Sequence, residues 1–131
     1  MPTAWRQADL LNPDDAVALG LVDASQRDTQ RVMVISHSCD LARDVADESH
    51  VELLIGTVVD EARATSRNGH SIGRLHLELE VSGAKEWTEY LISARQTIGK
   101  SALLQLEPWT YRCSSAQRRV LQRWLAQRYA R

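Results

Sequence analysis

The sequence predicts a mainly β protein in which an antiparallel meander of four or five strands forms a small barrel or sandwich, followed by a C-terminal amphipathic helix. Three patterns indicate this. Residues 32–35 are four consecutive apolar side chains, as in a strand buried on both faces. Residues 74–81 alternate apolar and polar side chains, which is typical of a strand with one polar face. Residues 120–129 repeat apolar side chains at helical spacing.

The first half of the chain adds further strands and one turn. Residues 16–22 fit either a first strand or a short helix capped by Asp14 or Asp15. Residues 50–59 form a second apolar strand, with Gly56 as a bulge or a point of close approach. The polar stretch that follows contains Asn68–Gly69, a dipeptide typical of tight hairpin turns.

The second half predicts a turn, a strand and two helical segments. Ser82–Gly83 is the turn, residues 87–94 are the next strand, and residues 97–106 are a short helix or an irregular crossing before Pro108. Ser114 and Gln117 have the spacing of a capping box at the start of the last helix. Its polar face carries arginines at positions 118, 119, 123, 128 and 131. We expect one domain over residues 1–131, with the barrel at about 16–106 and the helix at about 115–131.

Composition indicates an ordinary globular protein of 131 residues, with no apolar run long enough for a membrane span. The N-terminus lacks the pattern of a signal peptide, so we expect a cytoplasmic protein with no membrane partner. In that setting Cys39 and Cys113 are expected to be free thiols. No cofactor is expected.

Charge is distributed unevenly along the chain. Residues 95–131 hold Glu107 as their one acid against eight Lys and Arg, whereas residues 1–94 are strongly acidic. The basic end is suited to phosphate or to the acidic remainder of the chain. Arginine supplies 14 of the 16 basic residues, which favours bidentate contacts to phosphate or carboxylate.

Reactive side chains are densest directly after the buried run, at Ser36, His37, Ser38, Cys39 and Asp40. Cys39 is a candidate nucleophile, with Asp40 to orient a histidine base. The histidines available as that base are His37, His76 and His50. The alternative is a half-buried structural cysteine at a strand end. A zinc site is conceivable by residue type, but neither a CxxC nor an HxxxH spacing occurs, so no metal is expected.

Arg74, His76 and Glu78 share the polar side of the alternating strand. Such a row either lines a cleft or is the solvated outer face of a barrel. The arginines of the last helix have the same two interpretations, since they can contact a nucleic acid or an acidic partner, or can be solvated. No motif for sequence-specific readout accompanies them.

Three segments resemble the PemK/MazF family of bacterial toxin-type ribonucleases. Arg31 with the apolar run and Ser36 is similar to the family's Arg-Pro, strand and Ser, and Thr57 is similar to the Thr of its Pro-x-Thr. Residues 97–103 (TIGKSAL) are similar to its closing Thr-Ile-Asp-Lys-Ser-Arg-Leu, with Arg95 just upstream. The chain departs from the family at Val32, Ile55, Gly99 and Ala102, where the family has Pro, Pro, Asp and Arg.

The resemblance implies a small SH3-like antiparallel barrel and metal-independent RNA cleavage, in which the 2′-OH attacks the adjacent phosphate. It implies Arg31 as phosphate clamp and Thr57 as hydroxyl donor. Together with the thiol and base considered above, the candidate catalytic residues are Arg31, Thr57, Cys39 and His76. Arg95 and Arg74 are candidate phosphate contacts, and Asp40 and His37 are candidate orienting residues.

The chain also resembles small uncharacterised bacterial proteins that carry Ser-x-x-Cys-Asp-Leu after a strand and Arg-x-Leu-His-Leu later. Residues 36–41 have the first pattern, and residues 74–77 (Arg-Leu-His-Leu) are similar to the second but one residue shorter. Three functional hypotheses follow. The first is a nucleic-acid-associated ribonuclease with RNA as its partner. The second is a non-catalytic accessory or regulatory subunit of a bacterial defence or toxin system, acting through a protein partner or as a homodimer. The third is a Cys39-dependent hydrolase or transferase.

Overall fold

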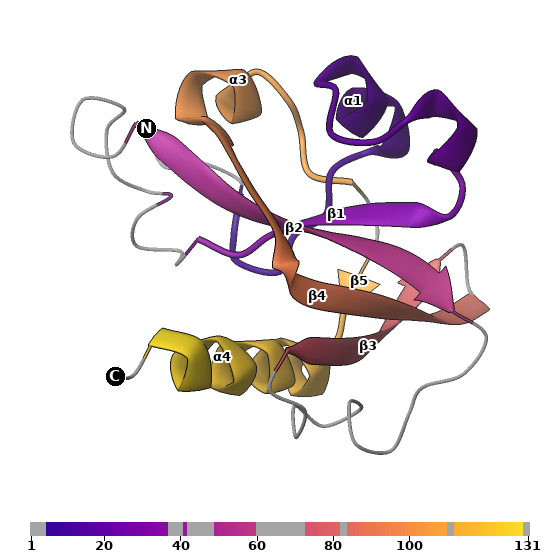
Figure 1. Cartoon of the computed structure of the whole chain (residues 1–131), viewed down its shortest axis with the longest axis vertical. Helices are drawn as coiled ribbons and strands as arrows, with labels where there is room; N and C mark the ends of the chain where they lie inside the picture. The colour runs from indigo at the N-terminus through magenta and orange to yellow at the C-terminus, as the bar shows by residue number, and fades with distance from the viewer. Residues whose placement is uncertain are drawn as a thin grey trace.

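A computed structural model describes residues 5–36, 41, 49–59, 73–81, 84–109 and 112–129. The chain is mainly β, as predicted, and the sheet lies between α4 on one side and α1 and α3 on the other (Figure 1). The turns predicted at Asn68–Gly69 and Ser82–Gly83 lie outside the described residues.

One antiparallel sheet has the strand order β1-β2-β4-β3-β5. Its strands are β1 (Gln30–Val34), β2 (His50–Val59), β3 (Arg74–Val81), β4 (Ala84–Gly99) and β5 (Arg112–Cys113). The predicted meander is wrong, because β2 pairs with β4 and not with the next strand in sequence. Two features explain this order. The connection between β2 and β3 is too long for a tight hairpin, and β4, with 16 residues, is long enough to pair with β2 and β3 together.

The sheet is open and is not closed into a barrel by strand pairing among the described residues. A segment before α1 lies along the outer edge of β1, where the Ala8 and Leu11 amides donate to the carbonyls of Val34 (2.8 Å) and Val32 (2.9 Å). The Trp109 amide then donates to the Leu10 carbonyl at 2.9 Å. These contacts cover the β1 edge and connect it to the segment that leads into β5.

The short elements differ in part from the expectations. Residues 16–22 do not form a strand, because the chain there is the helix α1 (Pro13–Ala18) and the turn after it. Its N-cap is Asn12, whose side chain accepts the Asp14 N–H at 2.9 Å, rather than either aspartate. A 3₁₀ turn, η1 (Ala24–Gln26), follows. Of the two interpretations of residues 97–106, the short helix is confirmed as α3 (Lys100–Leu104), and the residues before it are the end of β4.

The helix α4 (Ser115–Tyr129) begins where the sequence predicted. The Ser114 hydroxyl accepts the Gln117 N–H at 3.2 Å, which is half of the expected capping box. The Gln117 side chain instead accepts the backbone N–H of Glu78 on β3 at 3.0 Å. The residue therefore joins the helix to the sheet. No helix in the described part of the chain is long and apolar enough to cross a membrane.

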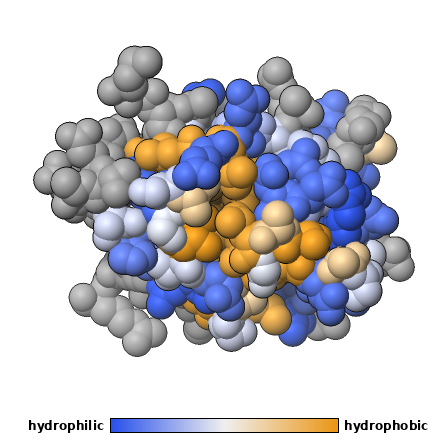
Figure 2. Space-filling model, turned by 90° about the horizontal axis from the view of Figure 1, so that it is seen from above, coloured by the Kyte–Doolittle hydropathy of each residue, from blue (hydrophilic) through white to orange (hydrophobic). Residues whose placement is uncertain are grey.

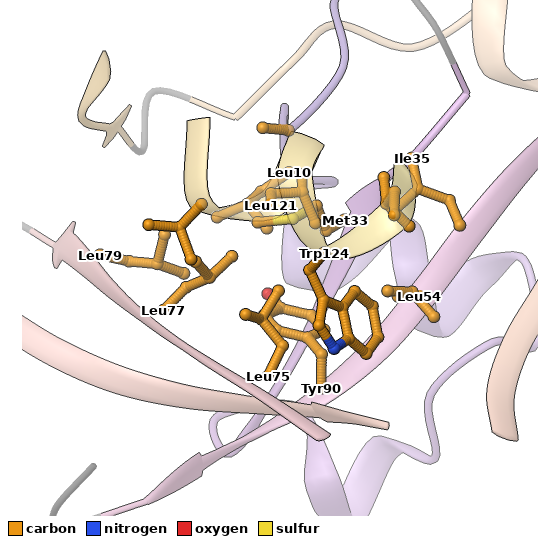
Figure 3. Close-up of a cluster of buried hydrophobic side chains, with 13 residues drawn as sticks. Leu10, Met33, Ile35, Leu54, Leu75, Leu77, Leu79, Tyr90, Leu121 and Trp124 are labelled. Carbon is orange, nitrogen blue, oxygen red and sulfur yellow. The ribbon is translucent and has the colours of Figure 1, made fainter. Parts of the chain in front are cut away.

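A first hydrophobic cluster fills the space between the sheet and α4. The Trp124 ring lies beside Tyr90, next to leucines from β3 (Figure 3). This confirms the predicted apolar side of residues 74–81 and the apolar face of the last helix. Its members are Ala8, Leu10, Met33, Ile35, Leu54, Leu75, Leu77, Leu79, Tyr90, Val120, Leu121, Trp124 and Leu125.

A second cluster lies on the other side of β1 and β2, under α1 and α3. Val32 and Val34 point into it, whereas Met33 and Ile35 point into the first cluster, so the prediction of a strand buried on both faces is confirmed. Its members are Trp5, Leu11, Ala16, Val22, Val32, Val34, Leu41, Val51, Leu53 and Leu103.

Gly56 is both a register irregularity and a close approach, as predicted. The β2–β4 ladder shifts between Leu54 and Gly56. A Cβ on Gly56 would lie 2.5 Å from Cε1 of the Tyr90 ring and 2.9 Å from the Glu89 carbonyl oxygen. Only glycine lets these two strands approach each other with Tyr90 packed between the sheet and α4.

Candidate functional site

The face of the sheet away from the first cluster carries a row of polar residues across three strands. Thr57 on β2 and His76 on β3 are the cross-strand partners of Glu89 on β4. Residues directly opposite each other in a sheet point to the same face, so these side chains are neighbours. Arg74 and Trp87 lie two residues along their strands from His76 and Glu89 and point the same way. We call the surface of these five residues the outer face.

Two basic side chains converge on one carboxylate oxygen of the outer face. His76 Nε2 lies 2.8 Å from Glu89 Oε2, and Arg74 Nε lies 3.5 Å from the same oxygen. The side chain of His76 is 1% exposed, whereas Glu89 is 23% and Arg74 36% exposed. The buried imidazole therefore donates to Glu89 from the sheet side of the carboxylate, while the carboxylate and the guanidinium reach solvent. The polar face predicted for β3 is confirmed, but its histidine is buried.

This cluster combines a proton acceptor with an anion-binding group. A carboxylate held by an imidazole N–H has a fixed orientation, as general base catalysis requires. Arg74 has N–H donors on its terminal nitrogens as well as on Nε, and a guanidinium matches the geometry of a phosphate. Thr57 is exposed beside Glu89 and offers a hydroxyl on the same face.

Arg31 lies elsewhere, on the opposite face from Thr57. Its cross-strand partner is Gly56, whereas Thr57 is paired with Gln30. Arg31 Nε lies 2.9 Å from Glu86 Oε1, and its guanidinium lies 5.5 Å from the centre of the Trp109 ring. The Arg31 side chain is 8% exposed. The two residues that the family resemblance placed together are therefore separated, and Arg31 holds a largely buried ion pair.

Of the remaining predicted residues, the structure describes Arg95, which is not on the outer face. Arg95 is exposed on the second half of β4 opposite Leu54, a member of the first cluster, so it points away from Arg74. His37, Cys39 and Asp40 lie outside the described residues. Next to them, the Ser36 hydroxyl accepts the Glu52 N–H at 2.8 Å, which is a structural contact between β2 and the end of β1.

The arginines of α4 do not all belong to one solvated face. Arg118 is half-buried, donates to the Gln7 carbonyl and lies 3.9 Å from Asp9. It attaches the helix to the N-terminal segment, in contrast to the prediction. Arg119 and Arg123 are exposed, as predicted.

Two residues of the outer face, Glu89 and Trp87, were not predicted from the sequence. Their strand carries polar side chains on both faces, since Glu86 and Thr88 point toward the first cluster. No clear alternation in this strand therefore marks the side that lies on the outer face. The signal that was available is the two-residue spacing of Lys85, Trp87 and Glu89, which puts them on one face of any strand.

Within the described residues, no three or more His, Cys, Asp or Glu side chains group as metal ligands. No protein-family model, no curated protein and no solved structure matches the chain.

Proposed function

We propose that the chain is a nucleic-acid-associated protein of the PemK/MazF type that cleaves single-stranded RNA without a metal ion, with Arg74, Glu89 and His76 at its reaction centre. The observation that carries the proposal is the convergence of His76 Nε2 and Arg74 Nε on Glu89 Oε2. The proposal also takes the sheet as an SH3-like barrel. Support for this is the chain of backbone contacts from the β1 edge through Leu10 to Trp109.

The chemistry assigns one role to each side chain. Glu89 takes the proton of a ribose 2′-OH, the 2′ oxygen bonds to the adjacent phosphorus, and the bond from phosphorus to the 5′ oxygen breaks. The leaving 5′ oxygen takes a proton from water, and the product is a 2′,3′-cyclic phosphate. Arg74 stabilises the charge on the phosphoryl oxygens. His76 is a positioning residue that holds Glu89, and the phosphate contact is assigned to Arg74 instead of Arg31.

The test is cleavage of a single-stranded RNA in the presence of EDTA. Glu89→Gln keeps the shape and loses the base, so we expect its rate to fall by about a hundredfold or more. Arg74→Ala is expected to lose a similar factor. The matched control is Glu80→Gln, an exposed carboxylate on the same face of β3, which should retain the wild-type rate.

Two results would contradict the proposal. One is the absence of cleavage in EDTA by folded wild-type protein. The other is a Glu89→Gln rate equal to that of wild type. A DNA strand of the same sequence should stay intact, because it lacks the attacking 2′-OH.

A second candidate function, an accessory subunit that binds a protein partner, is favoured by an apolar surface. Figure 2 shows hydrophobic side chains gathered in the middle of the face that carries α1 and α3. Leu104 on α3 is 43% exposed, and several apolar side chains packed against the second cluster are only partly buried. Contiguous apolar surface of this kind is typical of interaction sites. The partly exposed side chains are Val17, Leu19, Leu21, Ile55, Ile98 and Leu106.

This second candidate is tested by native mass measurement after co-expression with the protein encoded next to it. Leu104→Glu should abolish a complex without lowering the melting temperature, because the side chain is already exposed. Ala116→Glu, an exposed position on α4, is the control and should retain the complex. A complex equally strong in both variants would exclude the apolar surface as the binding site.

A further inference from the structure

We propose that Trp87 is a stacking platform for one nucleobase of a single strand bound across the outer face. This rests on the proposed function and names what the site recognises: an unpaired base beside the ribose and phosphate that the Glu89 cluster contacts. Aromatic side chains on a sheet stack on bases of any sequence, because every base has a π face.

Trp87 differs from the other tryptophans in its surroundings. Trp5 and Trp124 are buried in the two clusters, and Trp109 packs on the first cluster and on Arg31. Trp87 belongs to neither cluster in the described part of the chain, although it is a half-buried side chain on a central strand. A large aromatic ring outside the core and beside a polar cluster is suited to a ligand.

The order of groups along the outer face matches the order of groups in a nucleotide. Trp87 precedes Glu89 by two residues on β4, about 7 Å along the strand. On the other side of Glu89, Leu91 is the cross-strand partner of Arg74. The sequence of ring, carboxylate and guanidinium therefore corresponds to base, 2′-OH and phosphate.

The two carboxylates beside Trp87 each lie near a basic side chain. Its cross-strand partner Glu78 lies 3.7 Å from the Lys85 ammonium, and Glu89 is paired with His76 and Arg74. Val59, its partner on β2, provides an apolar neighbour for a stacked base. The base rather than the phosphate is thus expected to contact this end of the face.

The experiment measures binding of a fluorescently labelled single-stranded DNA by anisotropy, because DNA lacks the 2′-OH and stays uncleaved. Trp87→Leu, which keeps apolar bulk and removes the ring, is expected to weaken binding by about tenfold or more. Trp87→Phe should retain most of the affinity, since a ring remains. Lys85→Gln, on the same face, should reduce the salt dependence without removing the preference for bases.

A second ligand separates stacking from charge. An otherwise identical strand with abasic sites should bind wild-type protein as weakly as the normal strand binds Trp87→Leu. Equal affinities of Trp87→Leu and Trp87→Phe, both folded by circular dichroism, would overturn the proposal. So would equal binding of the abasic and normal strands.

The outcome is distinguishable from that of the cleavage test. Ring-dependent binding without RNA cleavage supports the stacking platform and removes the ribonuclease. Cleavage that depends on Glu89, with binding unchanged in Trp87→Leu, overturns the stacking platform and retains the ribonuclease.

Discussion

The ion pair between Arg31 and Glu86 offers a sharp test of the assignment of Arg31 to structure rather than to catalysis. The two side chains come from β1 and β4, lie 2.9 Å apart and are 8% and 21% exposed. Trp109 lies over the guanidinium. The perturbations are Glu86→Gln, which removes the carboxylate charge beside the buried guanidinium, and Arg31→Met, which leaves a carboxylate that still reaches water.

Burial determines the expected magnitudes. Removing one partner of a buried ion pair costs about 3–5 kcal/mol. Because part of Glu86 is exposed, we expect the lower end of this range, about 3 kcal/mol, for Glu86→Gln. Arg31→Met keeps an apolar chain against Trp109 and should cost less, about 1–2 kcal/mol. For a chain of this size, about 3 kcal/mol corresponds to a fall in melting temperature of about 10 °C.

Urea unfolding of both single variants and of the double variant measures these effects and their coupling. The double variant should lose less free energy of unfolding than the two single variants added together. Glu80→Gln is the exposed control and should change the free energy of unfolding by less than about 0.5 kcal/mol. A Glu86→Gln variant as stable as this control would refute the reasoning. So would loss of RNA cleavage by folded Arg31→Met.

Two further predictions concern packing and pH. Gly56→Ala should lower the free energy of unfolding by about 1–3 kcal/mol in urea unfolding, because its Cβ would lie 2.5 Å from the Tyr90 ring. An unchanged free energy of unfolding would mean that the Tyr90 ring moves aside without cost, and would contradict this prediction. Burial raises the pKa of the Asp9 carboxyl above its ordinary 3.8, although the hydrogen bond from the Arg6 N–H and the charge of Arg118 act to lower it. The folded state then holds the proton more tightly, so stability is lost as pH rises from about 4 through the raised pKa. Asp9→Asn, which keeps an acceptor oxygen, should remove this loss when the free energy of unfolding is measured between pH 4 and 7. The prediction is contradicted if the wild-type protein becomes more stable relative to Asp9→Asn over that range.

Much of the fold could be predicted because local sequence patterns specify the individual strands and helices. The apolar run at 32–35, the alternation at 74–81 and the helical spacing at 120–129 each specify an element and its buried side without reference to the rest of the chain. Gly56 was recognisable because a glycine inside an apolar strand usually marks a bulge or a close backbone approach. The cap of α1 was assigned to the wrong residue because Asn12, Asp14 and Asp15 all favour that position.

The candidate site was only half predictable. The polar side of β3, with Arg74 and His76, follows from alternation within one strand. Glu89 does not, because it meets His76 only through the pairing of β3 with β4, and its own strand has polar residues on both faces. The roles expected for Arg31 and Thr57 in one reaction rested on a resemblance, and the strand register places the two residues on opposite faces of the sheet.

The amino-acid sequence alone determined most of the strands and the last helix, together with the buried sides of residues 32–35, residues 74–81 and the helix, since these follow from side-chain periodicity over a few residues. Only the tertiary structure decided the strand order and the contact of the buried His76 with Glu89. It also decided the ion pair of Arg31 with Glu86, a residue 55 positions away. The physical reason is that alternation is compatible with many partners and registers. The choice among them depends on how the long strand β4, Gly56 and the covering helices pack together.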